Sequence, residues 1–255
     1  MAHRETIYRR ERFSEDRFAQ LLCYPRPSRE ALADRRRELD SLGVTAVESH
    51  GSQDLHGIRI LGKGCVSVVV LAHSESGRVA LKIRRMDADR PDMSREARYL
   101  EVANKSGVGP RLIAQSANFL LMEYVEGSTL QEWLKTSRSK TRMKSILRSV
   151  MEDCWRLDKV GLDHGELSAA PKHILIPERD KPVIIDFESA STSRRMANVT
   201  SVCQYLFIGS ALAATIQRLI DPFDKDQLIE KLRKYKTTST REAFEDILNI
   251  IDLKK

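Results

Sequence analysis

Residues 57–84 read GIRILGKGCVSVVVLAHSESGRVALKIR. Three β-branched runs alternate with short turns of Gly, Ser and His, a pattern that predicts three consecutive strands of an antiparallel meander. Gly62 and Gly64 lie in the first connection, and Ser67 begins the next run. Glycines at such a position let the backbone approach a triphosphate closely, whereas a Gly-x-Gly between strands is more often only a turn.

The third run places a cation inside an apolar segment. Lys82 ends the sequence Val79-Ala80-Leu81-Lys82. A strand lysine is normally a solvated edge residue, but this one has apolar neighbours on both sides. Residues 94–106 predict a helix, and Glu96 near its start is the natural ion partner of Lys82. The alternative is that Glu96 is an exposed helix acid.

The rest of the chain continues from strands to helices. Residues 119–127 (FLLMEYVEG) predict a buried strand, residues 129–135 and 141–160 predict helices, and HILI and PVIIDF predict two short strands. Residues 1–50 predict polar helices, which we interpret as a helical N-terminal extension. The order predicts an α+β protein with an N-terminal lobe over 51–125 and a reduced, mostly helical C-terminal lobe over 126–255.

Composition narrows the class of protein. The chain has 255 residues, 41% of them hydrophobic, and a formal net charge of +7. Its four cysteines are far apart and show no CxxC spacing, which argues against a disulfide framework or a zinc ribbon. The first residues contain no apolar run, and the uncharged stretch 196–217 is interrupted by polar residues, so we expect a buried helix there. We therefore expect a cytoplasmic protein that has no membrane partner.

Two later segments carry the motifs that identify a family. The first is Leu162-Asp163-His164-Gly165-Glu166-Leu167-Ser168, which is followed by Lys172-His173-Ile174-Leu175-Ile176. The second is Ile184-Ile185-Asp186-Phe187-Glu188. Together with the glycine turn, Lys82, Glu96 and Met122-Glu123-Tyr124-Val125, in that order, they resemble the protein-kinase-like superfamily. The His-Gly-acid-Leu-Ser segment looks most like RIO kinases, the KEOPS-complex kinase/ATPase and archaeal predicted serine/threonine protein kinases. The resemblance covers roughly residues 55–215.

This resemblance implies a two-lobed kinase-like fold that binds ATP with Mg²⁺ or Mn²⁺. It assigns Glu166 as the catalytic base and Asp186 as a metal ligand, and it lets Lys82 hold phosphates while Glu96 orients it. The residues that it places around the nucleotide are Gly62, Gly64, Ser67, Lys82, Glu96, Met122, Glu123 and Val125.

The sequence departs from the family at three positions of the site. Glu166 replaces an Asp, and the extra methylene displaces the carboxylate. The position of the metal-binding Asn is Pro171 by spacing, or His173 if two residues are inserted. Imidazole is a poor ligand for Mg²⁺, so His173 is a phosphate contact, a ligand for a softer metal such as Mn²⁺, or a structural residue. Glu188 replaces a Gly and is either a second metal carboxylate or a solvated or salt-bridged acid.

The densest positive cluster lies in residues 135–148, which contain no acid. Its members are Lys135, Arg138, Lys140, Arg142, Lys144 and Arg148. Such a run is usually a solvated surface, but the resemblance suggests RNA or a ribonucleoprotein as a partner. No aromatic residue interleaves the cluster, so the pattern does not indicate stacking on single-stranded nucleic acid.

Two hypotheses for function follow from these features. The leading one is an atypical serine/threonine protein kinase, or slow ATPase, that transfers the γ-phosphate of ATP to a hydroxyl or to water. The alternative is a nucleotide-binding pseudokinase or assembly factor without phosphotransfer, which the departures at residues 166, 173 and 188 favour. A small-molecule kinase is a third reading, but the short C-terminal part leaves little room for a substrate-binding insertion. The protein substrate is not identified by the sequence.

Overall fold

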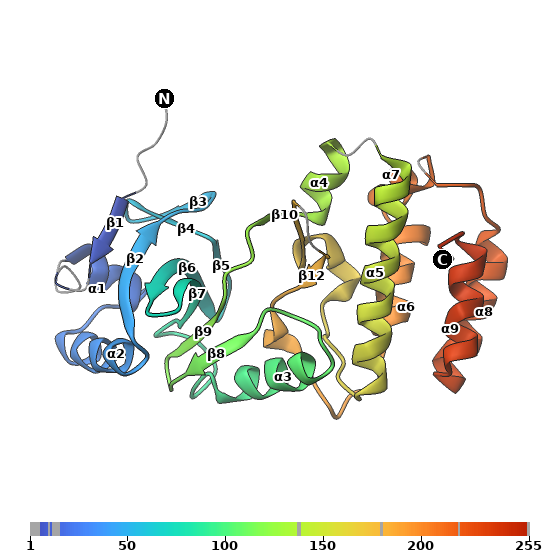
Figure 1. The fold of residues 1–255 in the computed structure, drawn as a ribbon. Helices are drawn as coiled ribbons and strands as arrows, with labels where there is room; N and C mark the ends of the chain where they lie inside the picture. Colours follow the sequence, from blue (N-terminus) through green and yellow to red (C-terminus); the bar gives the residue numbers. More distant parts are fainter. Residues whose placement is uncertain are drawn as a thin grey trace. The chain divides into compact units, whose positions relative to one another are not determined.

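The computed structural model describes residues 6–9, 11, 16–136, 139–178, 181–218 and 220–253 (Figure 1). The chain divides into two compact units. The first consists of Met1–Arg98 with Arg111–Tyr124, and the second of Tyr99–Pro110 with Val125–Lys255. Antiparallel sheets and separate runs of helices confirm the α+β class that the sequence predicts.

The first unit is built on an antiparallel sheet. Among the described residues, seven strands form it in the order β1-β2-β6-β7-β9-β8, with β5 paired to β6. A separate hairpin pairs β3 with β4. The strands are β1 (Thr6–Arg9), β2 (Val44–Ser49), β3 (Gln53–Leu55), β4 (Ile58–Ile60), β5 (Gly62–Lys63), β6 (Ser67–Ser74), β7 (Gly77–Arg84), β8 (Leu112–Gln115) and β9 (Phe119–Glu123). The first run of the predicted meander is thus divided between β4 and β5, while β6 and β7 pair directly as predicted.

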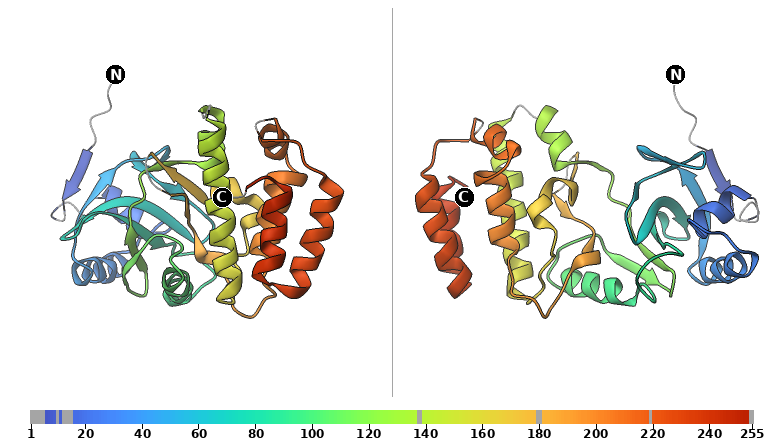
Figure 2. Two further views of the ribbon diagram at one scale, coloured as in Figure 1. Left: turned by 45° about the vertical axis from the view of Figure 1, so that its right-hand side comes forward. Right: turned by 180° about the vertical axis from the view of Figure 1, so that it is seen from behind.

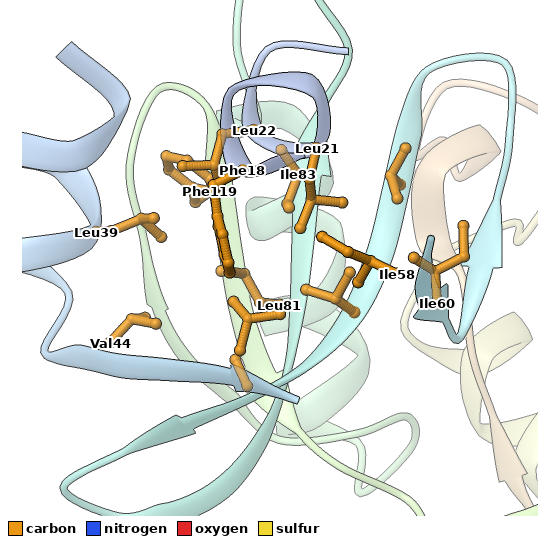
Figure 3. Packing of buried hydrophobic residues seen from close by; sticks show 14 of the residues in the cluster. Phe18, Leu21, Leu22, Leu39, Val44, Ile58, Ile60, Leu81, Ile83 and Phe119 are labelled. Carbon is orange, nitrogen blue, oxygen red and sulfur yellow. The ribbon is translucent and has the colours of Figure 1, made fainter. Parts of the chain in front are cut away.

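Residues 1–50 are not a purely helical extension. The segment contains α1 (Asp16–Leu22) and α2 (Arg29–Ser41), but also β1 and β2, and β2 pairs with β6 in the main sheet. The prediction is wrong for these two strands because Val44 and Val47 each lose all exposure when β2 joins the sheet. Phe18, Leu22 and Leu39 of the helices enter the same core (Figure 3).

A buried cation joins α2 to the sheet. Arg35 is 2% exposed and donates hydrogen bonds to the carbonyl of Leu22 and, over 3.0 Å, to Asn118 Oδ1. Glu38, one turn later, accepts hydrogen bonds from the backbone N–H of Asn118 at 2.9 Å and from its Nδ2 at 2.5 Å. Burial lowers the pKa of Arg35 to about 10. Asn118, between β8 and β9, therefore satisfies polar groups on both α2 and the sheet.

The second unit is mainly helical. Its sheet has the order β10-β11-β12, formed by β10 (Gly127–Thr129), β11 (Ile174–Pro177) and β12 (Val183–Ile184). Helix α3 (Ser94–Lys105) crosses the boundary between the units in the sequence. The other helical segments are α4 (Leu130–Thr136), α5 (Lys140–Lys159), η2 (Leu167–Lys172), η3 (Phe187–Ser189), α6 (Asn198–Cys203), η4 (Gln204–Ile208), α7 (Ala211–Gln217), α8 (Lys225–Thr238) and α9 (Arg241–Ile250). Helix α5 packs beside α6, and α8 beside α9 (Figure 2).

The uncharged stretch 196–217 is broken into shorter helices. Within the described parts of the chain, no single helix has the length and hydropathy needed to cross a bilayer. Asn198–Ile208 and Ala211–Gln217 meet that test only as a pair, and the pair is bent by 71°. The buried side chains of these segments include Val199, Phe207 and Ile216.

Several side chains of the basic cluster 135–148 form ion pairs or hydrogen bonds within the second unit. Lys140 Nζ lies 2.5 Å from one carboxylate oxygen of Asp221, and Lys144 Nζ lies 2.7 Å from the other. Lys144 also contacts the carboxylate of Asp252. These two cations link the start of α5 to segments that flank the C-terminal helices.

Two arginines of the cluster also form hydrogen bonds within the second unit. Arg142 donates to the carbonyl of Glu178, and Arg148 Nη1 donates over 2.5 Å to the carbonyl of Leu253. Arg138 lies outside the described residues. A contact of this surface with RNA stays a prediction, but at least four of its cations already have partners inside the unit.

We predict that Asn118→Ala lowers the free energy of unfolding by about 2 to 4 kcal/mol. The change removes hydrogen bonds from the buried guanidinium of Arg35 and from Glu38, and a charged group left unsatisfied costs more than a neutral one. Urea denaturation followed by circular dichroism measures the loss. The matched control is Asn249→Ala on the exposed side of α9, for which we expect a change within about 0.5 kcal/mol. Equal effects of the two substitutions would contradict the role of Asn118.

Candidate functional site

The glycine turn forms a tight hairpin in the first unit. Gly62 pairs with Val69, and the N–H of Gly64 donates over 2.8 Å to the carbonyl of Ser67. A Cβ atom built at Gly62 would meet no heavy atom within 4 Å, and one at Gly64 would meet only the Ser67 carbonyl, at 3.9 Å. Open space therefore lies over the backbone of the turn, which is the condition for close approach by a ligand.

Sequence reasoning missed Arg85, which anchors this hairpin. Its Nη1 donates over 2.8 Å to the carbonyl of Gly64, while Nε and Nη2 bind the carboxylate of Asp87. The guanidinium also lies 5.0 Å from the ring centroid of Tyr24. The adjacent Arg84 and Arg85, at the end of β7 and just after it, gave no signal in the sequence. The contact depends on the β6–β7 register, which brings the end of β7 beside the start of β6.

Lys82 and Glu96 form a buried ion pair. Lys82 Nζ lies 2.6 Å from Glu96 Oε1, and the two side chains are 4% and 3% exposed. Lys82 occupies β7, where it pairs with Val69 of β6 and Leu120 of β9, so hydrogen-bonded strands hold its backbone on both sides. The contact that the sequence predicts between these residues is present, and the reading of Glu96 as an exposed acid is wrong.

Three residues that the resemblance places around the nucleotide, Met122, Glu123 and Val125, lie at the end of β9 or just after it. Met122 is half-buried and pairs with Ala80, while Glu123 is exposed and pairs with Val79. Val125 is half-buried and belongs to the second compact unit. Their contact with a nucleotide stays a prediction.

The remaining predicted residues lie in the second unit, on a loop that requires glycine. Gly165 has φ +89°, and a Cβ there would stand 2.6 Å from the carbonyl of Ser189. Both facts exclude a larger residue without movement of the backbone. Gly165 thereby brings the segment that carries Glu166 against the segment that carries Asp186.

Glu166, His173 and Asp186 meet in space. Glu166 Oε2 lies 3.0 Å from His173 Nε2, and Asp186 Oδ2 lies 3.7 Å from His173 Nδ1. Glu166 precedes η2, His173 follows it, and Asp186 follows β12 with φ +70°. Within the described residues, this is the group of three potential metal ligands whose donor atoms all lie within 4.8 Å of one another. Glu188 does not belong to that group.

Ser189 is a second residue that the sequence did not indicate. Its hydroxyl donates a short hydrogen bond to Glu166 Oε1. The two carboxylate oxygens of Glu166 thus contact Ser189 and His173 respectively. A carboxylate has about four lone-pair positions, so Glu166 keeps capacity to accept a further hydrogen bond.

A buried polar network supports this loop from behind. Asp158 of α5 accepts hydrogen bonds from the backbone N–H of Asn198 at 3.0 Å, from its Nδ2 at 2.8 Å, and from the hydroxyl of Tyr235 at 2.9 Å. Asn198 Oδ1 in turn accepts the backbone N–H of His164 at 2.8 Å. Burial raises the pKa of the Asp158 carboxyl, an effect that these hydrogen bonds oppose.

His164 transmits that support to the Asp186 segment. Its Nε2 donates over 3.0 Å to the carbonyl of Ile185, which requires the tautomer with the proton on Nε2. The ring has no exposure and packs edge-on against Phe187 with centroids 5.0 Å apart. Burial lowers the pKa of His164 to about 4, so the ring is neutral near pH 7.

Comparison with known proteins agrees with this arrangement. Residues 73–199 match the family model of the RIO domain, a protein-kinase-like family. That range includes Lys82, Glu96, Glu166 and Asp186. Over this range the chain is similar to the RIO domain.

Curated relatives of this kinase-like chain are distant. It is 25% identical over 191 residues to the probable serine/threonine-protein kinase PknB of Bifidobacterium longum, an alignment of 64% of this chain and 27% of that protein. It is 25% identical over 197 residues to a probable serine/threonine-protein kinase of Streptomyces coelicolor, which covers 68% of this chain and 29% of that protein. The kinase-like chain thus spans less than a third of the length of these relatives. The predicted resemblance to the RIO kinases is confirmed, and the catalytic roles stay predictions.

The buried imidazole of His164 predicts a specific pH dependence of stability. The unfolded chain binds a proton at His164 below about pH 6.5, whereas the folded chain does not until about pH 4, so folding stability falls as the pH falls through this window. We expect the wild type to lose about 2 kcal/mol relative to His164→Asn between pH 6.5 and 5. Urea denaturation in EDTA at several pH values gives the difference.

His56→Asn, at an exposed histidine, is the matched control and should follow the wild type. A constant difference between the wild type and His164→Asn over this pH range would show that His164 titrates alike in both states.

Proposed function

We propose that the chain is an atypical serine/threonine protein kinase, or slow ATPase, that transfers the γ-phosphate of ATP to a Ser/Thr hydroxyl or to water. The buried ion pair of Lys82 and Glu96 carries this proposal. Two desolvated charges rarely contribute net stability, and an apolar pair of the same volume would serve a sheet at least as well. A lysine held in this way, one strand from an open glycine turn, is suited to binding phosphate oxygens.

The residues of the second unit supply groups for the transfer step. Glu166 would accept the proton of the attacking hydroxyl, and the hydroxyl of Ser189 would hold its carboxylate in place. Asp186 would bind the divalent cation that neutralises charge on the phosphates when it is present. Catalysis of this kind is mainly positioning and charge stabilisation, which agrees with the number of contacts that fix Glu166 and Asp186.

The chemistry of Glu166, His173 and Asp186 decides how well this site fits Mg²⁺. Mg²⁺ is bound by oxygen ligands in near-octahedral geometry. Asp186 and Glu166 meet this requirement, but His173 stands between them at 3.7 and 3.0 Å and offers nitrogen. The charge of these residues therefore fits a divalent cation bound with ATP. The nitrogen ligand at His173 fits Mg²⁺ poorly.

A nucleotide-binding pseudokinase is the second candidate. The observation that favours it is the contact of both Glu166 oxygens with neighbouring side chains, since a base must be reachable by the proton that it accepts. The remaining lone pairs of the carboxylate favour the active reading. Incubation with γ-labelled ATP and Mg²⁺ or Mn²⁺ separates the two candidates, because a pseudokinase labels neither protein nor free phosphate.

We predict that Lys82→Met lowers the rate of ATP turnover by about 100-fold or more, because a charged donor to the phosphates is lost. The change also leaves Glu96 buried without its cation, so the double variant Lys82→Met/Glu96→Gln is tested beside it to restore folding. Lys159→Met, at an exposed position of α5, is the matched control and should turn over ATP at the wild-type rate. Wild-type turnover in a folded double variant would refute the assignment of Lys82.

Glu166→Gln should lower kcat by about 100-fold and change KM for ATP by less than about threefold. Glutamine keeps an acceptor for Ser189 and the length of the side chain, but it cannot take a proton. Steady-state kinetics with labelled ATP measure both constants, and Glu75→Gln in the exposed β6–β7 turn is the control. An unchanged kcat would remove Glu166 from the catalytic step.

A further inference from the structure

His173 occupies a position where an imidazole is held by acids on two sides. Its side chain is 11% exposed, with Nε2 3.0 Å from Glu166 Oε2 and Nδ1 3.7 Å from Asp186 Oδ2. The ring also lies 5.7 Å, centroid to centroid, from the buried ring of His164. Neighbours at both ring nitrogens and the tilted ring of His164 therefore fix the orientation of the His173 ring.

The two nitrogen contacts differ in kind. The separation of 3.0 Å is that of a hydrogen bond, so Nε2–H donates to Glu166. The separation of 3.7 Å is too long for a hydrogen bond. In the tautomer that donates from Nε2, Nδ1 carries a lone pair directed to the side of Asp186.

That longer separation suits two ligands of one metal ion. Donor atoms bound at about 2.1 Å lie about 3.0 to 3.6 Å apart when the angle at the metal is between 90° and 120°. At 3.7 Å, Nδ1 and Asp186 Oδ2 lie just beyond the upper end of this range. The hydrogen bond of the opposite nitrogen to a carboxylate is the arrangement that fixes the tautomer of metal-binding histidines and raises their basicity.

We propose that His173 Nδ1 and the carboxylate of Asp186 bind a divalent first-row transition metal in preference to Mg²⁺, with Glu166 as the residue that orients the imidazole. Imidazole adds affinity for transition metals and little for Mg²⁺, which keeps oxygen ligands and water. The preference for a transition metal specifies the cation of the proposed kinase or ATPase, and its role in catalysis rests on that proposed function. The existence of the metal site does not rest on the proposed function, because its ligands are defined without a nucleotide.

Mn²⁺ is the probe, because its electron spin reports directly on bound nitrogen. Electron-spin-echo spectra are recorded on the full chain with Mn²⁺, both without nucleotide and with a non-hydrolysable ATP analogue. We expect ¹⁴N modulation from one imidazole, replaced by the ¹⁵N pattern when the protein is labelled with ¹⁵N-histidine. The labelling needs no substitution, so the test does not depend on the folding of a variant.

The selectivity is measured with His173→Asn, which offers an amide oxygen in place of the imidazole. We expect the ratio of the Mg²⁺ to the Mn²⁺ dissociation constant to fall about tenfold in this variant, and the nitrogen modulation to disappear. His56→Asn should leave both unchanged. Mn²⁺ bound without histidine nitrogen, no Mn²⁺ bound in either nucleotide state, or an unchanged ratio in His173→Asn would each overturn the proposal.

The test separates this proposal from the proposed function. Histidine-bound Mn²⁺ in a protein that does not turn over labelled ATP would keep the metal site and reject the kinase or ATPase activity. Turnover supported equally by Mg²⁺ and Mn²⁺, with no histidine nitrogen on the metal, would keep the kinase or ATPase activity and reject the metal site.

Discussion

The ion pair between Lys82 and Glu96 is the constraint on which the first unit depends. Both charges are almost fully removed from water, so each is tolerable only beside the other. The start of α3 must therefore remain packed on β7, and β7 itself is fixed by hydrogen-bonded neighbours on both sides. The glycine hairpin continues from β6, the strand next to Lys82, and Arg85 at the end of β7 holds its tip. The positions of Lys82 and of the glycine hairpin therefore both follow from the pairing of β6 with β7.

The second unit positions its acids by a different device, a chain of buried hydrogen bonds. It runs from Asp158 through Asn198 to His164, and from His164 to the carbonyl of Ile185 beside Asp186. The links among Asp158, Asn198 and His164 are buried, where an unpaired polar group is most costly, and the link to Ile185 is partly buried. A shift of the Asp186 segment would break links back to α5. The loop that carries Asp186 thus resists movement.

Local patterns predicted the parts of this site that local chemistry determines. A lysine among β-branched residues requires a partner, and the next helix offered one acid at its start, so the contact of Lys82 with Glu96 followed from sequence. Arg35 and Arg85 could not be found in this way. Their partners, Asn118 and Gly64, are 83 and 21 residues away, and an arginine in a polar helix or after a strand ordinarily faces water. The strand at 44–49 was missed because a six-residue segment after a helix shows little periodicity, and its pairing with β1 and β6 is not visible in the sequence.

The departures from the family pattern at Glu166 and His173 are best understood as one unit. Shortening Glu166 by a methylene would withdraw its carboxylate by about 1.5 Å, and the 3.0 Å contact with His173 would be lost. Replacing His173 by a shorter amide would equally leave Glu166 Oε2 without that donor. The longer acid and the imidazole thus fit each other, and each alone would be a defect. Their occurrence together supports the metal preference that we propose, since simple loss of function would not require the second change to complement the first.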